Sequence, residues 1–298
     1  MRIFITGATG FLGYHIAKSC ISKGYEVLCL KRSTSVSLFD AVQERQIMWI
    51  DADTENWKDT VVCFNPEVLI HCAWGGVSID SRNDCHVQHQ NIKFSEELFN
   101  LFLYKQIIVL GSQEEYGRID SVVNECHSLI PLTEYGKAKI ETCNILQECC
   151  DKQKIEWQWI RVFTVYGEKQ KETWLIPSMI RKCLNPLVIE METTRGEQTY
   201  SYLYSDDFAN AILSMIGAKG KSGIYNLSSS SPTMLKDLFT LIKQKTNSKI
   251  VFNSVLPYRE YQSMMIMGDS SKFKTTFGEY ESTSLDKGLD NIIQTINI

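Results

Sequence analysis

The sequence lacks the features that mark membrane, secreted and nucleic-acid-binding proteins. No apolar run approaches the roughly 20 residues of a membrane-spanning helix, and the first residues resemble a strand more than a signal peptide. A formal charge of −4, from 31 Lys and Arg against 35 Asp and Glu, leaves no basic excess for binding nucleic acid. We therefore expect a cytoplasmic protein that binds neither a membrane nor a nucleic acid.

A recognisable metal site is also missing. The ten cysteines are scattered, and none forms a Cys-x-x-Cys pair or joins a histidine at metal-ligand spacing. Several lie in apolar runs, where a thiol acts as a small hydrophobic group. His86 and His89 share a polar segment with only Asp84 and Cys85 nearby. We expect reduced, mostly structural cysteines and no metal ion.

What the 298 residues do contain is a glycine fingerprint behind an N-terminal strand. Residues 2–6 form a β-branched and aromatic run, and Gly7, Gly10 and Gly13 follow at spacings of three. The first glycine permits a tight turn, the second lets backbone N–H groups approach a pyrophosphate, and the third lets the next helix pack closely. The pattern predicts a bound dinucleotide, although glycines so spaced also occur in simple turns.

The residues after the fingerprint complete a βαβ unit of about 30 residues. A helix is predicted over 11–23, with Gly24 where a C-terminal cap belongs, and a strand over 25–30. NAD-specific folds place a carboxylate after this second strand. Here Lys31, Arg32 and Ser33 follow instead, and all three suit a 2′-phosphate. We expect NADP(H); the alternative is a solvated basic loop.

Strand and helix patterns continue to alternate along the first half of the chain. Further strands are predicted over 47–50, 68–73, 106–110 and 157–163. Such alternation predicts a Rossmann-type α/β fold, a doubly wound parallel sheet whose ligand crevice lies at the carboxyl ends of the strands. Ser112 and the sequence Trp74-Gly75-Gly76 both follow such strand ends.

The spacing of Tyr135 and Lys139 is the main catalytic signal. On a helix from Thr133 or Glu134 to about Cys150, residues four apart share one face. A free tyrosine has a pKa of about 10, and a nearby cation favours the phenolate, so we expect Lys139 to lower the pKa of Tyr135. Lys139 also suits the nicotinamide ribose, and Ser112 can polarise a substrate carbonyl. Alone, Tyr-x-x-x-Lys also occurs by chance on surface helices.

These motifs together resemble the extended short-chain dehydrogenases/reductases of the nucleotide-sugar epimerase, dehydratase and ketoreductase group. The likeness covers nearly the whole chain. Beyond the glycines and the Tyr135 to Lys139 run, the matching segments are 69–73, 111–117, 161–167, 204–207, 225–227, 256–259 and 268–272.

The resemblance implies a dinucleotide-binding domain over 1–167 with returning segments at about 202–227. A smaller C-terminal α/β substrate lobe would comprise 168–201 and 228–298. It also implies a homodimer through helices near 92–104 and 134–150, and a role in deoxysugar biosynthesis of the kind that serves lipopolysaccharide.

The same resemblance gives the expected site residues. The expected catalytic residues are Ser112, Tyr135 and Lys139. The expected cofactor contacts are Gly7, Thr9, Gly10, Phe11, Leu12, Gly13, Lys31, Arg32, Ser33, Asp51, Ala52, Ala73, Tyr135 and Lys139. The expected substrate contacts are Trp74, Gln113, Glu114, Thr164, Arg181, Tyr200 and Arg259.

Departures from the family pattern narrow the expected reaction. Dehydratases of the group carry Asp-Glu after the catalytic serine or threonine, whereas this chain has Gln113 and Glu114, which disfavours dehydration. The basic Lys31 and Arg32 suggest NADPH consumed as a reductant. We expect reduction of the 4-keto group of a nucleoside-diphosphate 4-keto-6-deoxyhexose. The alternatives are an epimerase that holds NAD tightly and a non-catalytic NADP sensor.

The substrate end also departs from the family. Thr164 stands where asparagine is common, and residues 198–201 lack the usual arginine. Arg259 remains for the substrate diphosphate, and Arg195 or Arg181 can compensate, since a diphosphate favours a bidentate arginine. The alternative for Arg259 is a surface salt bridge. Trp174, Arg181, Tyr200 and Met265 are further pocket candidates that no motif fixes.

Overall fold

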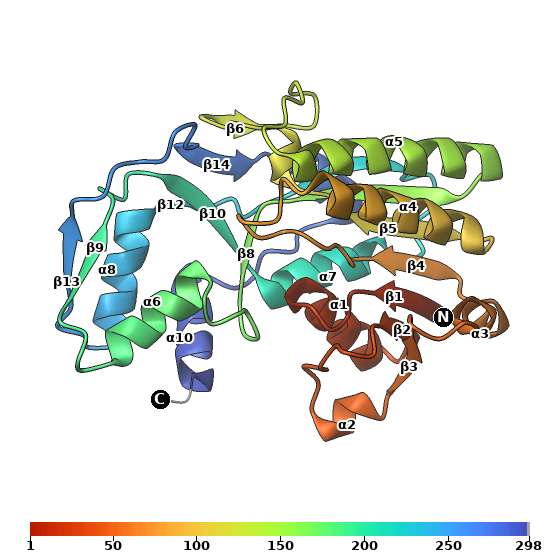
Figure 1. Cartoon of the computed structure of the whole chain (residues 1–298), viewed down its shortest axis with the longest axis horizontal. Helices are drawn as coiled ribbons and strands as arrows, with labels where there is room; N and C mark the ends of the chain where they lie inside the picture. The colour runs from red at the N-terminus through yellow and green to blue at the C-terminus, as the bar shows by residue number, and fades with distance from the viewer. Residues whose placement is uncertain (297–298) are drawn as a thin grey trace.

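Seven parallel strands form the central sheet of the computed structural model, which describes residues 1–296 (Figure 1). Their order across the sheet is β11-β7-β5-β4-β1-β2-β3. The strands are β1 (Arg2–Thr6), β2 (Glu26–Lys31), β3 (Ile47–Asp51), β4 (Val68–His71), β5 (Gln106–Leu110), β7 (Glu156–Val162) and β11 (Gly223–Leu227). The strand order reverses between β1 and β4, and such a reversal opens a ligand crevice at the carboxyl ends.

Helices cover both faces of this sheet, because its strands are apolar on both sides. Ile3 and Ile5 of β1 face one core and Phe4 faces the other. The first core is covered by α1 (Phe11–Ser22), α7 (Ser205–Met215) and α9 (Ser271–Phe277). The second is covered by α3 (Trp57–Phe64), α4 (Cys85–Leu101) and α5 (Glu134–Gln153), of which α4 and α5 run side by side (Figure 1). The predicted doubly wound α/β fold is confirmed.

A smaller lobe lies beside the carboxyl ends of the central strands (Figure 1). Its main sheet has the order β12 (Pro232–Met234), β10 (Thr199–Tyr204), β14 (Met265–Gly268) and β6 (Val122–Val123), and β8 (Thr164–Tyr166) also pairs with β10. A second sheet joins β9 (Glu190–Thr193) and β13 (Val251–Ser254). The helices are α6 (Leu175–Leu184), α8 (Leu235–Lys245) and α10 (Leu285–Thr295), which enclose a third core.

The segment predicted to return to the larger lobe contributes to both lobes. From residues 202–227, α7 packs against α1 and β11 extends the central sheet beside β7. In contrast, β10 pairs with β8, β12 and β14 in the smaller lobe. Residues 297–298, which end the expected substrate lobe, lie outside the described residues.

The remaining elements are short: α2 (Ala41–Glu44) follows β2, and the 3₁₀ turn η1 (Gln113–Glu115) follows β5. Most predicted elements are found within one to three residues of their expected ends. The strand predicted over 68–73 ends at His71, although the backbone N–H of Cys72 still donates to the Thr6 carbonyl. In the part of the chain that is described, no helix has both the length and the apolar character needed to cross a membrane.

Candidate active site

The turn between β1 and α1 has the shape of a pyrophosphate cradle. Gly7 has a φ of +75°, and a Cβ there would lie 2.6 Å from the Ala73 nitrogen. A Cβ on Gly13 would lie 2.2 Å from the Gly7 carbonyl oxygen. Helix α1 begins after Gly10, which offers no side-chain cap, so the first backbone N–H groups remain available to an anion. The residues present therefore fit the dinucleotide that the fingerprint predicts.

The other expected contacts at this turn differ in exposure. Thr9 and Leu12 are half-buried, whereas Phe11 is buried and packs edge-on against Trp174 at 5.9 Å between ring centroids. Only the backbone of Phe11 is therefore well placed for a phosphate. Ala73, at the end of β4, donates its N–H to Thr6 Oγ1 at 3.3 Å and closes the opposite side of the turn.

The carboxyl ends of β2 and β3 bring together the residues expected near the adenosine ribose. Lys31 lies over the Trp49 ring at 5.2 Å, and its carbonyl accepts from the Ala52 N–H at 2.8 Å. Arg32 and Ser33 are exposed. Asp51 ends β3 and accepts the Asp53 N–H at 2.9 Å.

Sequence reasoning missed the carboxylate at this position. Asp53 Oδ2 accepts hydrogen bonds from both the backbone N–H of Ser33, at 3.0 Å, and its hydroxyl, and these bonds lower the pKa of Asp53. The Ser33 hydroxyl, expected to donate to a 2′-phosphate, is therefore already engaged. Asp53 lies 20 positions after Ser33, so no local motif joins the two.

The three expected catalytic residues lie close together beyond the end of β5. Thr133 caps α5 by accepting the Gly136 N–H at 3.1 Å, and so places Tyr135 and Lys139 on consecutive turns. Lys139 is buried and donates its Nζ to the Leu110 carbonyl at 2.7 Å. Ser112 is also buried and follows Leu110 by two residues. A side-chain hydrogen bond between Ser112 and Tyr135 lowers the pKa of the phenol.

Trp74 is packed into this catalytic cluster. The Lys139 ammonium lies 3.5 Å from the Trp74 ring centroid, and the indole meets the Tyr135 ring edge-on at 6.0 Å. The indole Nε1 donates to the Oε1 atom of buried Gln88 at 2.8 Å, which fixes the ring orientation. An aromatic face on an ammonium is a favourable cation–π arrangement.

The prediction that Lys139 lowers the pKa of Tyr135 is wrong in this geometry. Burial raises the pKa of Tyr135 to about 12, and Ser112 opposes this more than any other neighbour. The Lys139 ammonium points to Leu110 and Trp74 and stays 5.7 Å from the tyrosine ring centroid. Burial also lowers the pKa of Lys139 to about 7, although the charge of Glu115 acts to raise it. The phenol is therefore a protonated acid at neutral pH.

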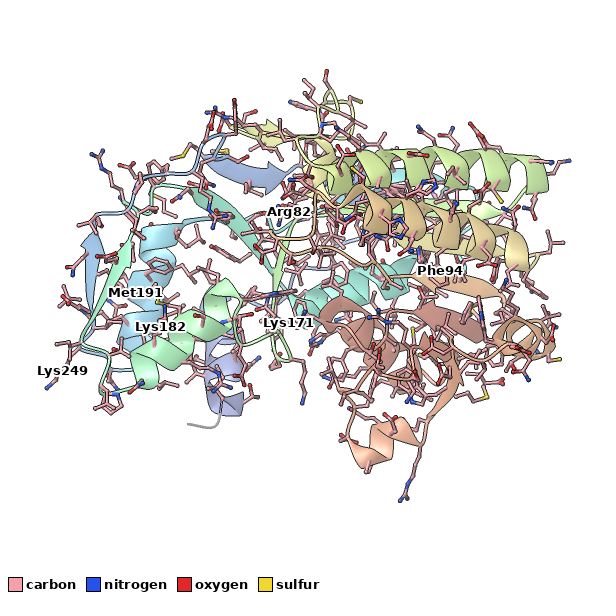
Figure 2. All side chains as sticks on the ribbon, in the orientation of Figure 1. Arg82, Phe94, Lys171, Lys182, Met191 and Lys249 are labelled. Carbon is pink, nitrogen blue, oxygen red and sulfur yellow. The ribbon has the colours of Figure 1, made fainter. Side chains whose placement is uncertain are left out.

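Gln113 and Glu114 line the same region on η1. Glu114 Oε1 accepts from the Arg82 Nη1 atom at 2.9 Å, and its other oxygen lies 3.4 Å from the Thr133 hydroxyl. Arg82 belongs to the loop after β4, and its carbonyl accepts the Tyr135 N–H at 2.9 Å. Figure 2 shows Arg82 beside the inner end of α4, where the two lobes meet. No motif singles out this arginine, and sequence reasoning missed it.

The expected substrate-binding residues of the smaller lobe lie in different places. Tyr200, on β10, lies close to Arg259: burial raises the pKa of its phenol, and Gln262 and Arg259 act against that rise. Thr164 lies on β8, paired with Tyr202 of β10. Arg181, on α6, instead forms an ion pair with Glu172 at 2.5 Å. Hydrogen bonds and ion pairs within the described residues do not join Arg181 to Tyr200 or Arg259.

The described part of the chain holds no group of three or more His, Cys, Asp and Glu side chains arranged to bind a metal. Its ten cysteines are all free thiols. Burial raises the pKa of Cys20 and Cys143 to about 12. Such thiols stay protonated at neutral pH and fill core space.

Fold and site together define a class: a Rossmann-type α/β protein with a dinucleotide cradle and a serine, tyrosine and lysine grouped at the carboxyl ends of its strands. Residues 3–228 match the family described as NAD dependent epimerase/dehydratase, and the chain belongs to that family. The resemblance to extended short-chain dehydrogenases/reductases is thereby confirmed.

Two curated relatives span nearly all of the chain. One is dTDP-4-dehydro-6-deoxyglucose reductase of Escherichia coli, 22% identical, covering 99% of this chain and 97% of the relative. The other is CDP-abequose synthase of Salmonella muenchen, 24% identical, covering 98% and 97%.

Solved structures of epimerases share the fold. UDP-glucose 4-epimerase of Thermotoga maritima, solved with UDP-glucose, has a TM-score of 0.87 at 22% identity and covers 99% of this chain and 98% of its own. UDP-glucuronic acid 4-epimerase of Bacillus cereus, solved with UDP-glucuronic acid and NAD, has a TM-score of 0.82 at 21% identity, with the same coverage.

Proposed function

We propose that the protein reduces the 4-keto group of a nucleoside-diphosphate 4-keto-6-deoxyhexose with NADPH. The observation that carries this proposal is the Tyr135 phenol beside Ser112, whose pKa burial raises to about 12, with the Glu114 carboxylate on η1 held in an ion pair by Arg82. A reductase needs a proton donor at this position, whereas a dehydratase needs a free base. The curated relatives include the E. coli reductase of a 4-dehydro-6-deoxy sugar nucleotide.

The proposed mechanism divides the work among three side chains. The backbone N–H groups of the Gly7 to Gly13 turn would hold the pyrophosphate of the dinucleotide and Lys139 its nicotinamide ribose, and the bound cofactor would supply a hydride. Ser112 donates a hydrogen bond to the C4 carbonyl oxygen and stabilises the negative charge that develops there. Tyr135 transfers its phenolic proton to that oxygen and completes the hydroxyl group. The resulting tyrosinate recovers a proton from solvent.

Of the two roles expected for Lys139, this proposal keeps the one toward the nicotinamide ribose. Its Nζ is anchored on the Leu110 carbonyl with the Trp74 ring against it, so it suits a hydroxyl-rich ligand such as the nicotinamide ribose. A lysine with a pKa of about 7 is partly neutral in the free protein, and binding a polar ligand would favour its charged form.

An epimerase that keeps NAD bound is the second candidate, and Asp53 is the observation that favours it. A carboxylate at the end of these strands suits the two hydroxyls of an NAD ribose, and Asp53 is turned toward Ser33. Arg32, exposed in the same place, favours the 2′-phosphate of NADP(H) instead.

The test is to mix the purified protein with NADPH or NADH and a panel of dTDP-, CDP-, GDP- and UDP-linked 4-keto-6-deoxy sugars. Stoichiometric loss of reduced nicotinamide with one nucleotide, faster with NADPH, is the expected result. Interconversion of sugars without net cofactor oxidation would overturn the reductase in favour of the epimerase. Equal or better use of NADH would overturn the NADP(H) preference alone, and Asp53→Ala would then be expected to weaken NADH binding.

A further inference from the structure

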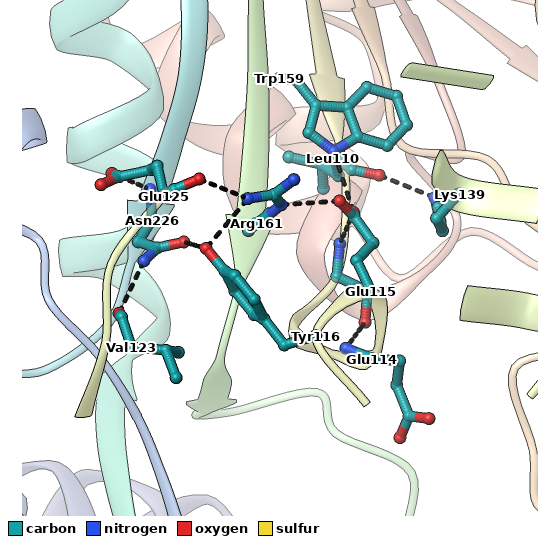
Figure 3. Close-up of polar contacts among 11 residues, drawn as sticks. Leu110, Glu114, Glu115, Tyr116, Val123, Glu125, Lys139, Trp159, Arg161 and Asn226 are labelled. Carbon is teal, nitrogen blue, oxygen red and sulfur yellow. Dashed lines mark hydrogen bonds and ion pairs between the residues drawn. The ribbon is translucent and has the colours of Figure 1, made fainter. Parts of the chain in front are cut away.

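Glu115 is a carboxylate with no exposed surface, placed directly beneath the candidate catalytic serine. Its Oε1 atom accepts from the backbone N–H of Ser112 at 2.8 Å and from Trp159 Nε1 at 2.9 Å. Its Oε2 atom accepts from Arg161 Nε at 2.7 Å. Figure 3 shows the carboxylate between Trp159 and Arg161. Every hydrogen bond is charge-assisted and buried, which makes the arrangement strong and rigid.

Two hydrogen bonds join Ser112 to the turn η1. Glu115 holds the Ser112 N–H, while Ser112 Oγ accepts the Glu114 N–H at 3.2 Å, so the turn η1 is closed at both ends. The strand end leaves no spare room: a Cβ on Gly111 would lie 2.2 Å from Trp159 Nε1 and 2.6 Å from Glu115 Oε1. The position of the Ser112 hydroxyl therefore depends on Glu115.

The support for Glu115 extends into the smaller lobe. Arg161 Nη1 donates to the Tyr116 hydroxyl at 3.0 Å, and that hydroxyl donates to Asn226 Oδ1 at 2.7 Å. Asn226 Nδ2 donates in turn to the Val123 carbonyl of β6 at 2.9 Å (Figure 3). The chain of bonds runs from the catalytic turn to β6, at the edge of the main sheet of the smaller lobe.

We propose that Glu115 is a positioning residue for the reaction, which fixes Ser112 through its backbone and supplies the buried negative charge that faces Lys139 and Tyr135. It touches neither substrate nor cofactor in this role. The kinetic consequences of this role rest on the proposed function. The placement of Ser112 by Glu115 rests on the hydrogen-bond geometry.

The electrostatic consequence has a definite sign. Glu115 on η1 is the charged neighbour that raises the pKa of Lys139, while burial keeps the nearby Cys72 thiol and His71 ring neutral. Around Tyr135, Glu115 and Glu114 on η1 raise the pKa of the phenol, and a hydrogen bond from Ser112 and the charge of Arg82 lower it. Removing the Glu115 charge should lower the pKa of both catalytic groups. Both Lys139 and Tyr135 would then lose a proton at a lower pH than in the wild type.

The test compares Glu115→Gln with the double variant Glu115→Gln/Arg161→Gln. The single change leaves Arg161 as an unpaired buried charge and can prevent folding; the double change removes both charges together. Glu156→Gln is the matched control, because Glu156 also accepts several hydrogen bonds but lies at the opposite end of β7. Circular dichroism first establishes which variants are folded.

Two measurements then decide. The phenolate absorbance of Tyr135, taken as the difference between each variant and its Tyr135→Phe partner, should titrate at lower pH in the folded Glu115 variants and be unchanged in Glu156→Gln. With substrate, kcat should fall at least tenfold, and the alkaline limb of its pH profile should move to lower pH. A wild-type titration and pH profile in the folded double variant would overturn the proposal. A shifted titration in a protein that reduces none of the sugars would overturn the proposed function and leave the role of Glu115 standing.

Discussion

At the scale of single residues, the candidate site combines Tyr135, an acid that stays protonated at neutral pH, with Lys139, an amine whose pKa is about 7. Burial sets both, because Lys139 is buried and Tyr135 is half-buried beside Trp74, Ser112 and the end of β5. The i, i+4 spacing correctly puts the two side chains on one face of α5. It says nothing of the indole that covers the ammonium, since Trp74 comes from a loop 65 positions before Lys139.

Tyr135→Phe tests the proton donor directly. Phenylalanine keeps the ring and its contact with Trp74 but has no proton to transfer, so kcat should fall by about 10²- to 10⁴-fold. The Kd for NADPH, measured by titration, should not change. Activity that survives the substitution would mean that another group protonates the product oxygen.

Lys139→Met tests the buried amine through stability. The pKa of Lys139 is about 7 in the folded protein and near its ordinary value of 10.5 in the unfolded chain. Between these values the unfolded chain holds more protons, so raising the pH stabilises the folded wild type by about 1.4 kcal/mol per pH unit. Below pH 7 the full cost of burying the Lys139 charge opposes folding. Above pH 10.5 that cost is absent, because the amine is neutral in both the folded and the unfolded state.

Urea denaturation of both proteins from pH 6 to 10 measures the effect. The free energy of unfolding of the wild type relative to Lys139→Met should rise with pH from about 7 upward. The difference cancels the contributions of other titrating groups, and a constant difference across the range would contradict the low pKa of Lys139.

At the scale of elements, short-range sequence patterns predict the strands and helices well. They do not predict the contacts between residues that are far apart in the sequence. The run at residues 2–6 and the glycines after it lie in one stretch of sequence, so β1, the turn and α1 can be predicted together. Asp53 with Ser33, and Arg82 with Glu114, are 20 and 32 positions apart. Only the folded sheet brings them together, and no single sequence reveals that they touch.

Gly13→Ala tests the junction of β1 and α1. The added Cβ would lie 2.2 Å from the Gly7 carbonyl oxygen, so backbone must move and the cradle must open. We expect the protein to lose about 1–3 kcal/mol of stability, as in other over-packed sites, and most of its dinucleotide affinity. Gly75→Ala is the control, because a Cβ there meets its nearest atoms at an ordinary 3.5 Å. Equal stability and cofactor affinity in the two variants would refute the close approach.

At the scale of the whole molecule, the position of the smaller lobe over the carboxyl ends of the central strands agrees with the strand order. The reversal at β1 and β4 can be inferred from the alternation of strands and helices, and it locates the crevice. The division of residues 202–227 between the two lobes cannot, because β10 and β11 have similar apolar patterns and differ only in their partners.

The expected homodimer through α4 and α5 remains a prediction, and the outer surface of these helices qualifies its character. Lys93, Glu96 and Asn100 on α4 and Glu141 and Asn144 on α5 are exposed. Obligate dimers bury apolar surface, so a dimer through this polar face should be weak and salt-sensitive. Sedimentation velocity at low and high salt should show a dimer that dissociates as salt rises. A monomer at every concentration would contradict the dimer.

The buried Glu115 and Arg161 also constrain how this sequence can evolve. Removing one partner of a buried ion pair costs about 3–5 kcal/mol, a large part of the roughly 5–15 kcal/mol that keeps a domain folded. Descendants of this sequence must therefore keep both residues or exchange both at nearly the same time. The partly exposed Arg82 and Glu114 carry no such restriction and can drift one at a time. We expect substrate preference to diversify around the second pair while the first stays as it was inherited.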